Sequence, residues 1–364
     1  MPRKGGDLLV HAWTVHQPRQ PMRLEAREET AGASEVIVEI AGCGVCHTDL
    51  GFYYEGVPTR HPWPLTLGHE IAGRVVECGE GAAEWLGREV VVPAVVPCGD
   101  CAACSAGRGQ ICARQIFPGN DVHGGFASHV RMPARGLCRV PDLSDPALNP
   151  GGLALAMLSV VADAVSTPYQ AIRRSGLRAG DLAIVVGCGG VGGFAVQIAA
   201  ALGAHVAAID LDADRLERLR AHGASLALDA GELDFKTLKS AISSFAAEHA
   251  IPSFRQFVFE TSGTTGGQST AWGLLGAGGY LSIVGFTAAK VELRLSNLMA
   301  FDATAQGNWA CLPELYPEIV ELVLAGAVAV EPFVELRPLA EINPIFEALR
   351  AGAHPRRIVL VPES

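Results

Sequence analysis

The residues of this sequence best suited to chemistry are four cysteines in one short stretch: Cys98, Cys101, Cys104 and Cys112. Thiolates with this spacing, in a chain whose N-terminal apolar run is too short for a secretory signal, indicate a tetrahedral zinc site. The residues between them are mostly Gly, Ala and Ser and cannot form a core, so metal binding would stabilise this lobe, at about residues 93–115. Four unrelated free thiols or two disulfides are the alternatives.

A second motif is a glycine-rich segment between an apolar run with strand character and an apolar run with helix character. This context distinguishes a dinucleotide-binding loop from a chance glycine pattern. Gly187 permits a tight turn, Gly189 lets a pyrophosphate approach the backbone, and Gly192 lets helix and strand pack closely. Gly190 and Val191 complete the loop, and the following helix N-terminus would offer free N–H groups to the phosphates. A glycine turn without a nucleotide is the alternative.

The acidic residue at the end of the next predicted strand, Asp210, indicates which dinucleotide is bound. A carboxylate at this place accepts hydrogen bonds from the adenosine ribose hydroxyls and repels a 2′-phosphate. Leu211, where a basic residue could favour NADP, is apolar. The sequence therefore predicts NAD as the cofactor.

Length and composition limit the elements that can hold these motifs. With 364 residues, 49% of them hydrophobic, the chain is longer than one core usually supports, so we expect about two domains. The net charge of −10 argues against nucleic acid or an anionic membrane surface as a partner. Ten cysteines without a secretory signal favour a reducing compartment, and we expect a cytoplasmic protein. The apolar stretch 182–209 is broken by glycines and predicts a buried β-α-β unit rather than a membrane span.

The periodicity of the sequence changes along the chain. Short β-like runs separated by Gly/Pro-rich turns come first, at 35–40, 71–76, 89–92 and 127–132. From about Leu182 strands alternate with helices, which indicates a parallel sheet. The predicted strands lie at 182–187, 205–210, 225–229, 256–261 and 280–285, and the predicted helices at 190–203, 212–222, 234–249 and 264–275. Two further helical runs, at 313–326 and 340–352, lead into a last strand at 357–361.

The β-rich part carries a thiol and an imidazole, Cys46 and His69, which suit a zinc ion with one open position. They lie in the segments Gly42–Asp49 and Gly68–Glu70. Together with the cysteine lobe and the glycine loop, these segments resemble the zinc-containing medium-chain alcohol dehydrogenases. The resemblance covers nearly the whole chain, including Tyr169–Ile172 and Arg356–Val359.

This resemblance implies an α/β plus β fold, in which a GroES-like β catalytic domain joins a Rossmann coenzyme domain with a doubly wound parallel sheet. The catalytic domain would span residues 1–164, the NAD-binding domain 165–306, and the segment 307–364 would complete the catalytic domain. The family also implies two zinc ions per chain, one of them in the cleft between the domains, and homodimers or homotetramers. His47, Arg215 and Arg356 would contribute to NAD binding.

The family pattern further implies the roles of the site residues. Cys46 and His69 would bind the catalytic zinc, Glu70 would either lie just outside its ligands or act as an exchangeable ligand, and Thr48 would relay the substrate proton. The structural zinc would take the four cysteines of the lobe. The usual third ligand is a cysteine six residues before the tyrosine at the domain entry, and here that place is Asp163. A carboxylate can bind zinc; a capping or salt-bridged carboxylate is the alternative.

The implied reaction is hydride transfer from a secondary alcohol to NAD. Zinc would act as a Lewis acid that lowers the pKa of the alcohol, and Thr48 would pass the proton outward. Gly51 stands where many relatives carry a histidine, so the outer end of the relay is unassigned, and water is the simplest acceptor there.

Within the family, the chain resembles the 6-hydroxycyclohex-1-ene-1-carbonyl-CoA dehydrogenases of anaerobic benzoyl-CoA degradation. The matching features are Asp163, the segment Phe52–Tyr54 and the stretch 56–67. The substrate would then be a cyclic allylic alcohol on a CoA thioester. Candidates for binding its phosphates are Arg60 with His61, or Lys290 with Arg294. The alternatives are a generic secondary-alcohol or polyol dehydrogenase and, in another class, a non-enzymatic NAD-binding sensor.

Overall fold

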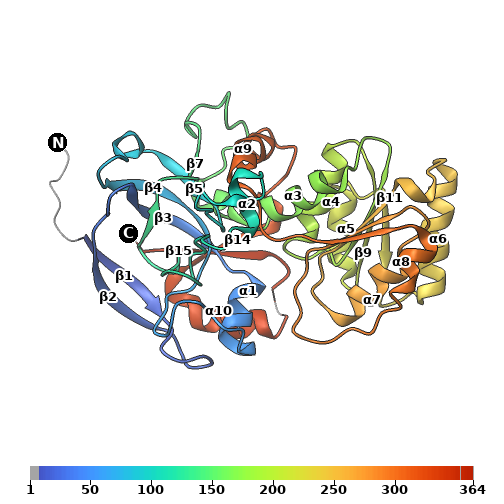
Figure 1. The fold of residues 1–364 in the computed structure, drawn as a ribbon, viewed down its shortest axis with the longest axis horizontal. Coiled ribbons are helices and arrows are strands. Elements are labelled where there is room, and N and C mark those ends of the chain that lie inside the picture. The colour runs from blue at the N-terminus through green and yellow to red at the C-terminus, as the bar shows by residue number, and fades with distance from the viewer. Residues whose placement is uncertain (1–7, 353, 364) are drawn as a thin grey trace. The chain divides into compact units, whose positions relative to one another are not determined.

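The computed structural model describes residues 8–352 and 354–363. The contacts between residues divide the chain into two compact units. Unit 1 contains the chain up to Ser166, the segment Ala310–Gly326 and the chain from Val330 onward. Unit 2 contains Thr167–Trp309 and Ala327–Ala329. The chain therefore leaves unit 1, builds unit 2 and then returns to complete unit 1 (Figure 1).

Unit 1 is built on a seven-stranded, mainly antiparallel sheet. Its strands, in spatial order, are β14 (Val334–Pro338), β15 (Arg357–Val361), β3 (Glu35–Gly44), β4 (Glu70–Cys78), β5 (Glu89–Val92) and β7 (Cys138–Arg139), with β6 (His129–Pro133) also paired to β3. A separate antiparallel pair consists of β1 (Leu8–Thr14) and β2 (Arg23–Glu29). Because β15 pairs with β3, the C-terminal segment is part of the same sheet as the strand that leads to Cys46.

Two groups of helices complete unit 1. The short helices α1 (His47–Leu50), η1 (Gly51–Glu55, a π-helix), α2 (Ala102–Ser105) and η4 (Leu155–Ala162, a 3₁₀ helix) lie in connections that carry the sequence motifs. The C-terminal helices are α9 (Tyr316–Leu324) and α10 (Ile342–Arg350). Apolar residues of α10, such as Ile345 and Phe346, share one core with residues of β3 and β4.

Unit 2 is a parallel six-stranded sheet flanked by helices (Figure 1). Its strands are β8 (Leu182–Val186), β9 (His205–Asp210), β10 (Leu226–Asp229), β11 (Gln256–Glu260), β12 (Tyr280–Ile283) and β13 (Thr304–Gly307). Its helices are α3 (Ser166–Ser175), α4 (Gly192–Ala201), α5 (Ala213–Arg220), α6 (Phe235–Glu248), α7 (Thr265–Leu274) and α8 (Ser296–Phe301). The strand order β10-β9-β8-β11-β12-β13 is that of a Rossmann fold.

The predicted fold class is confirmed. The five strands and four helices predicted between residues 182 and 285 are present, because their apolar runs are buried in the parallel sheet and its flanking helices. Strand β2 was not predicted, since its sequence is highly charged and mostly exposed. Within the described ranges, no single helix is long and apolar enough to cross a membrane; the bent pair Leu155–Ala162 and Ser166–Ser175 meets those criteria only when the two are taken together.

Candidate active site

The four cysteines of the lobe come together around a common centre. The Sγ–Sγ distances are 3.4 Å for Cys98–Cys112, 3.5 Å for Cys101–Cys104, 3.6 Å for Cys101–Cys112 and 3.9 Å for Cys98–Cys104. A tetrahedron with Zn–S bonds of about 2.3 Å has edges of about 3.8 Å. The backbone N–H of Arg114 lies 3.3 Å from the Cys112 sulfur, and hydrogen bonding from the Cys104 backbone lowers the pKa of Cys101 to about 6. These donors fit a fully coordinated zinc ion.

A second cluster lies at the start of α1 and β4. Cys46 precedes α1, His69 and Glu70 lie where β4 begins, and Asp163 follows the 3₁₀ helix η4. One ligand atom from each of these four residues lies within 4.8 Å of the others. The Asp163 Oδ2 atom lies 3.7 Å from the Cys46 sulfur and 3.6 Å from His69 Nε2. The sequence-predicted residues are thus brought together from three separate parts of the chain.

The donor set of this cluster also fits zinc. Bonds of about 2.0–2.3 Å to N, O and S donors give tetrahedral edges of about 3.3–3.8 Å, and the two distances from Asp163 to Cys46 and to His69 lie in that range. His69 is 2% exposed and Cys46 is 7% exposed, so the ligands are removed from bulk water. Three such ligands leave a fourth position open, unlike the four-cysteine lobe.

Asp49 holds His69 in place. Its fully buried carboxylate accepts hydrogen bonds from the backbone N–H groups of Cys46 (2.9 Å) and Gly68 (3.2 Å) and lies 3.3 Å from His69 Nδ1. The other ring nitrogen of His69 therefore faces Asp163. Burial lowers the pKa of His69, but the Asp49 charge and the hydrogen bonds with Asp163 and Asp49 raise it well above its ordinary value overall. The surroundings of this imidazole favour positive charge, which suits a cation.

Glu70 is engaged by an arginine from the other end of the chain. Arg357 on β15 donates from Nε to Glu70 Oε2 at 2.8 Å and from a second nitrogen to Oε1. Burial raises the pKa of Glu70, and the charge of Arg357 opposes that rise. Burial alone would lower the pKa of Arg357, but the charge of Glu70 outweighs it, so the pKa of Arg357 is raised overall. A Cβ atom at Gly44 would collide with the Glu70 carboxylate, so the glycine leaves room for this ion pair.

The residues beside Cys46 have different environments. Thr48 is partly buried, and its hydroxyl oxygen lies 3.7 Å from the Cys46 sulfur. His47 is exposed and lines a pocket together with Leu50. Gly51 is buried at the start of the π-helix η1. Thr48 is therefore the hydroxyl of α1 that lies at the metal-binding cluster.

The glycine-rich loop of unit 2 has the geometry expected of a nucleotide site. Gly187 has a φ of +85°, a backbone conformation that favours glycine. A Cβ atom at Gly192 would collide with the Gly187 carbonyl oxygen, so close packing of β8 and α4 requires a glycine there. At Gly189 a Cβ atom would meet no protein atom within 4 Å. Its open surroundings leave space for a pyrophosphate at the N-terminus of α4.

Asp210 lies at the end of β9, beside this loop. Its carboxylate accepts hydrogen bonds from the backbone N–H groups of Cys188 (2.5 Å) and Leu211 (2.8 Å) and from the Arg215 guanidinium at 2.9 Å. Asp210 and Arg215, both predicted to bind the cofactor, are thus in contact. Arg356, also predicted to bind the cofactor, lies in unit 1 and forms an ion pair with Glu335 at 3.2 Å.

Two residues at the metal cluster were given no role from sequence. Asp49 is part of the segment Gly42–Asp49, and a carboxylate three residues after a ligand cysteine is a signal for a capping contact. Arg357 gave a weaker signal, a cation at the start of an otherwise apolar strand. Its partner Glu70 is distant in sequence, so only the sheet topology could identify the pair.

A Rossmann unit with a phosphate-binding loop and a β unit with a partly open metal-ligand set define a metal-dependent dinucleotide oxidoreductase. Comparisons with known proteins agree. The alcohol dehydrogenase GroES-like domain matches residues 32–142, and the zinc-binding dehydrogenase domain matches residues 190–325. An alcohol dehydrogenase of Geobacillus stearothermophilus is 30% identical over 330 residues, which cover 90% of this chain and 91% of that protein.

Solved structures resemble the chain along nearly its whole length. The crystal structure of AibC is 27% identical, with a TM-score of 0.86 and coverage of 98% of this chain and 96% of that chain. Acetophenone reductase from Geotrichum candidum, in complex with NAD, is 26% identical, with a TM-score of 0.83 and coverage of 98% of both chains. The chain belongs to the zinc-dependent medium-chain alcohol dehydrogenase family, and it is an oxidoreductase with zinc and NAD as cofactors.

Proposed function

We propose that this enzyme oxidises a secondary alcohol to the ketone with NAD, and catalyses the reverse reduction, at the cluster of Cys46, His69 and Asp163. The spacing of these three donors, with the Thr48 hydroxyl 3.7 Å from the Cys46 sulfur, carries the proposal. Zinc bound there supplies Lewis acidity toward the alcohol oxygen. Thr48 accepts the hydroxyl proton and passes it to water, since Gly51 has no side chain to receive it.

The hydride balance completes the reaction. NAD, when bound, would take up the hydride of the carbinol carbon while the hydroxyl gives up its proton, so the products would be ketone, NADH and one proton. In unit 2, the loop Gly187–Gly192, which includes Gly190 and Val191, would hold the pyrophosphate. Asp210 would accept hydrogen bonds from the ribose. Arg215 would order the Asp210 carboxylate.

Asp163 rather than Glu70 is proposed as the third zinc ligand. Both Glu70 carboxylate oxygens are engaged by Arg357, whereas Asp163 faces Cys46 and His69. The test is metal content after exhaustive dialysis. The wild type should hold about two zinc ions per chain, Asp163→Ala should hold only that of the cysteine lobe, and Glu70→Gln should keep both. Retention of both ions by Asp163→Ala would refute this ligand assignment.

For the substrate, a cyclic allylic alcohol on a CoA thioester is one candidate, and its 6-oxo product would be the conjugated ketone. It is supported by the Asp163, Phe52–Tyr54 and 56–67 features of the sequence. A generic secondary alcohol or polyol fits the site equally well, and the likeness to an alcohol dehydrogenase and to an acetophenone reductase supports it. NADH formation measured with a cyclic hydroxy-enoyl-CoA beside cyclohexanol and sorbitol separates them: equal or faster turnover of the simple alcohols excludes the CoA candidate.

The remaining proposals concern the domain boundaries, the assembly of subunits and the cellular compartment. We place the catalytic domain at 1–164 and 307–364 and the coenzyme domain at 165–306, and expect a homodimer or homotetramer in the cytoplasm. A reducing compartment keeps the lobe thiols available for zinc. Light scattering of the zinc-loaded protein tests the assembly, and a monomeric mass would contradict it.

A further inference from the structure

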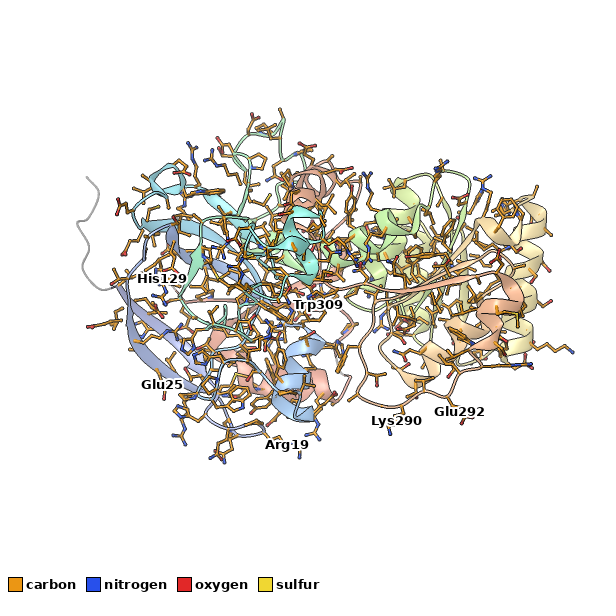
Figure 2. The ribbon with its side chains drawn as sticks, in the orientation of Figure 1. Arg19, Glu25, His129, Lys290, Glu292 and Trp309 are labelled. Atoms are coloured by element: carbon orange, nitrogen blue, oxygen red, sulfur yellow. The ribbon has the colours of Figure 1, made fainter. Side chains whose placement is uncertain are left out.

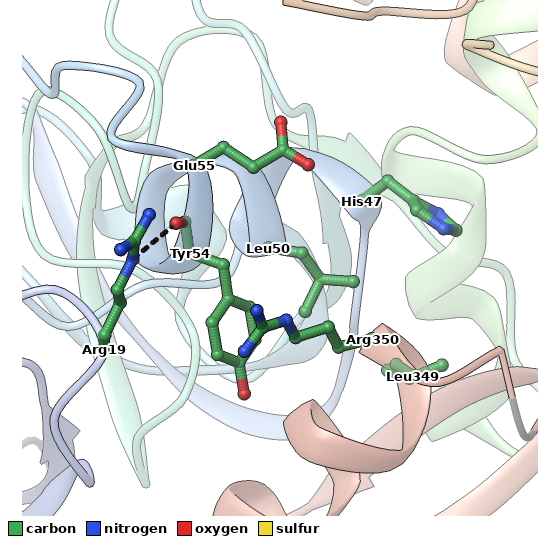
Figure 3. Close-up of a pocket in the computed structure, with 7 residues that line it drawn as sticks. All are labelled: Arg19, His47, Leu50, Tyr54, Glu55, Leu349 and Arg350. Atoms are coloured by element: carbon green, nitrogen blue, oxygen red, sulfur yellow. Dashed lines mark hydrogen bonds between the residues drawn. The ribbon is translucent and has the colours of Figure 1, made fainter.

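Unit 1 contains a pocket of about 380 Å³ directly beside α1 (Figure 3). It is lined by residues of α1, of the π-helix η1, of the loop after β1 and of the C-terminal end of α10: Arg19, His47, Leu50, Tyr54, Glu55, Leu349 and Arg350. His47 stands between Cys46 and Thr48 in the sequence. The pocket therefore adjoins the helix that carries the proposed proton relay.

Arg19 is held at this pocket by an uncommon backbone conformation. Its φ of +66° lies in the left-handed region, which is costly for a residue other than glycine. The backbone N–H of Arg19 donates to the Tyr53 carbonyl at 3.0 Å, and its Nε donates to the Tyr54 carbonyl at 2.8 Å. Both acceptors belong to the π-helix, a rare structure that is frequent at functional sites.

Arg350 is fixed by stacking. Its guanidinium lies 4.7 Å from the centre of the Tyr54 ring, and Figure 3 shows it over that ring, while Arg19 reaches the carbonyl of the same tyrosine. The neighbouring Tyr53 is locked by its hydroxyl, which donates to the Gln20 carbonyl at 2.6 Å, and by edge contact with Phe346. Tyr54 thus positions two cations.

Neither of these arginines forms an ion pair with a carboxylate in the part of the chain that the structure describes. Glu55 lines the same pocket, and Glu347 lies one turn before Arg350, but neither is within ion-pair distance of the two guanidinium groups. Two ordered guanidinium groups with free donors that line one pocket suit an oxyanion.

We propose that this pocket binds an anionic group, a phosphate or a carboxylate, carried by the alcohol substrate away from its carbinol carbon. The inference rests on the proposed function and narrows its substrate class to anionic alcohols. Leu50, Leu349 and the Tyr54 ring provide apolar walls for the part of the substrate that joins the anion to the reacting end. The volume is that of a small-ligand site.

The cations that the sequence suggested for a charged substrate are less suited. Arg60 is already paired with Asp121 at 3.3 Å, and Arg294 donates to the Ser296 hydroxyl. Figure 2 shows Lys290 at the surface beside Glu292. Arg19 and Arg350, in contrast, share one pocket, which His47 and Leu50 of α1 also line.

The test compares Arg19→Gln and Arg350→Gln with Arg74→Gln, an exposed control whose arginine pairs with Glu89. The alcohols are cyclohexanol, 3-hydroxycyclohexanecarboxylate and a hydroxycyclohexenoyl-CoA. The two anionic alcohols are first ranked by their KM with the wild type. For the one with the lower KM, each pocket variant should raise KM about tenfold or more, as expected for loss of a charged hydrogen bond. KM for cyclohexanol and for NAD should stay unchanged, and the control should match wild type. The proposal would be overturned if KM rose for the neutral alcohol as well, if KM rose for NAD instead, or if no KM rose at all.

Binding of inorganic phosphate keeps this test separate from the proposed reaction. Titration calorimetry of the zinc-loaded enzyme should detect phosphate binding that is lost in Arg350→Gln and retained in Arg74→Gln. If no alcohol is oxidised but this difference is observed, the proposed function fails while the anion site stands. If phosphate binding is equal in all variants, the anion site fails whatever the turnover.

Discussion

The buried ion pair between Glu70 and Arg357 leads to a quantitative prediction. The Arg357 side chain is 4% exposed and that of Glu70 is 0% exposed, and two hydrogen bonds join them. Arg357→Met has a similar length but leaves a buried carboxylate without its partner. Removal of one member of a buried pair costs about 3–5 kcal/mol. We therefore expect the free energy of unfolding at pH 8 to fall by that amount.

The assay is denaturant unfolding of the zinc-loaded protein, followed by fluorescence and circular dichroism, with a double-mutant cycle. Because Glu70→Gln removes the buried charge, the double variant Arg357→Met/Glu70→Gln should recover most of the loss. The matched control is Arg356→Met, one residue earlier, whose side chain is 42% exposed and pairs with Glu335. It should cost about 0.2–1 kcal/mol. A loss for Arg357→Met no larger than that of the control would refute the reasoning.

Three further predictions concern the metal and nucleotide sites. Gly189→Ala should fold normally but bind NAD about tenfold more weakly in a fluorescence titration, a loss of about 1.4 kcal/mol. Gly192→Ala should instead lower the melting temperature, because its methyl group meets the Gly187 carbonyl oxygen. Equal melting temperatures for the two variants would contradict the difference between the open space at Gly189 and the close contact at Gly192. Asp49→Asn should weaken the catalytic zinc about 10–100-fold in chelator competition without changing the lobe zinc, and unchanged affinity would remove Asp49 from the positioning of His69. Cys104→Ser should lose one zinc ion per chain and lower the melting temperature while the catalytic zinc stays; two remaining ions would exclude the lobe as a metal site.

Much of the fold could be predicted because burial leaves a direct trace in the sequence. In unit 2, strands such as β8 are buried along their whole length, so they appear as continuous apolar runs between glycines. Strand β2 has no such trace: it is a mostly exposed, charged strand stabilised by its register with β1. Strand β13 pairs at the sheet edge and is similarly exposed. Pairing at an edge depends on a neighbour rather than on the strand's own sequence.

The residues of the candidate site also fall into those that the sequence could identify and those that it could not. Cysteines at fixed spacing and glycines in a strand-turn-helix context are local signals, and the structure brings each set together. Asp163 could be suggested because it stands at the position of the family's usual third ligand, and because a carboxylate in an apolar run needs a partner. Arg19 could not be suggested at all, since its place at the pocket depends on a left-handed backbone and on carbonyl groups of a π-helix. Such contacts arise from the tertiary structure and leave no spacing to recognise.

The position of Arg357 links the fold of unit 1 to the metal cluster. Four potential zinc donors lie in one cluster, yet a catalytic zinc needs a free position for the substrate. Arg357 holds both oxygens of Glu70, which leaves Cys46, His69 and Asp163 as the proposed ligands. This arginine is supplied by β15, the strand through which the C-terminal segment returns to unit 1. The return of the chain therefore does more than complete a sheet: it also supplies the charge that pairs with the fourth potential donor, Glu70.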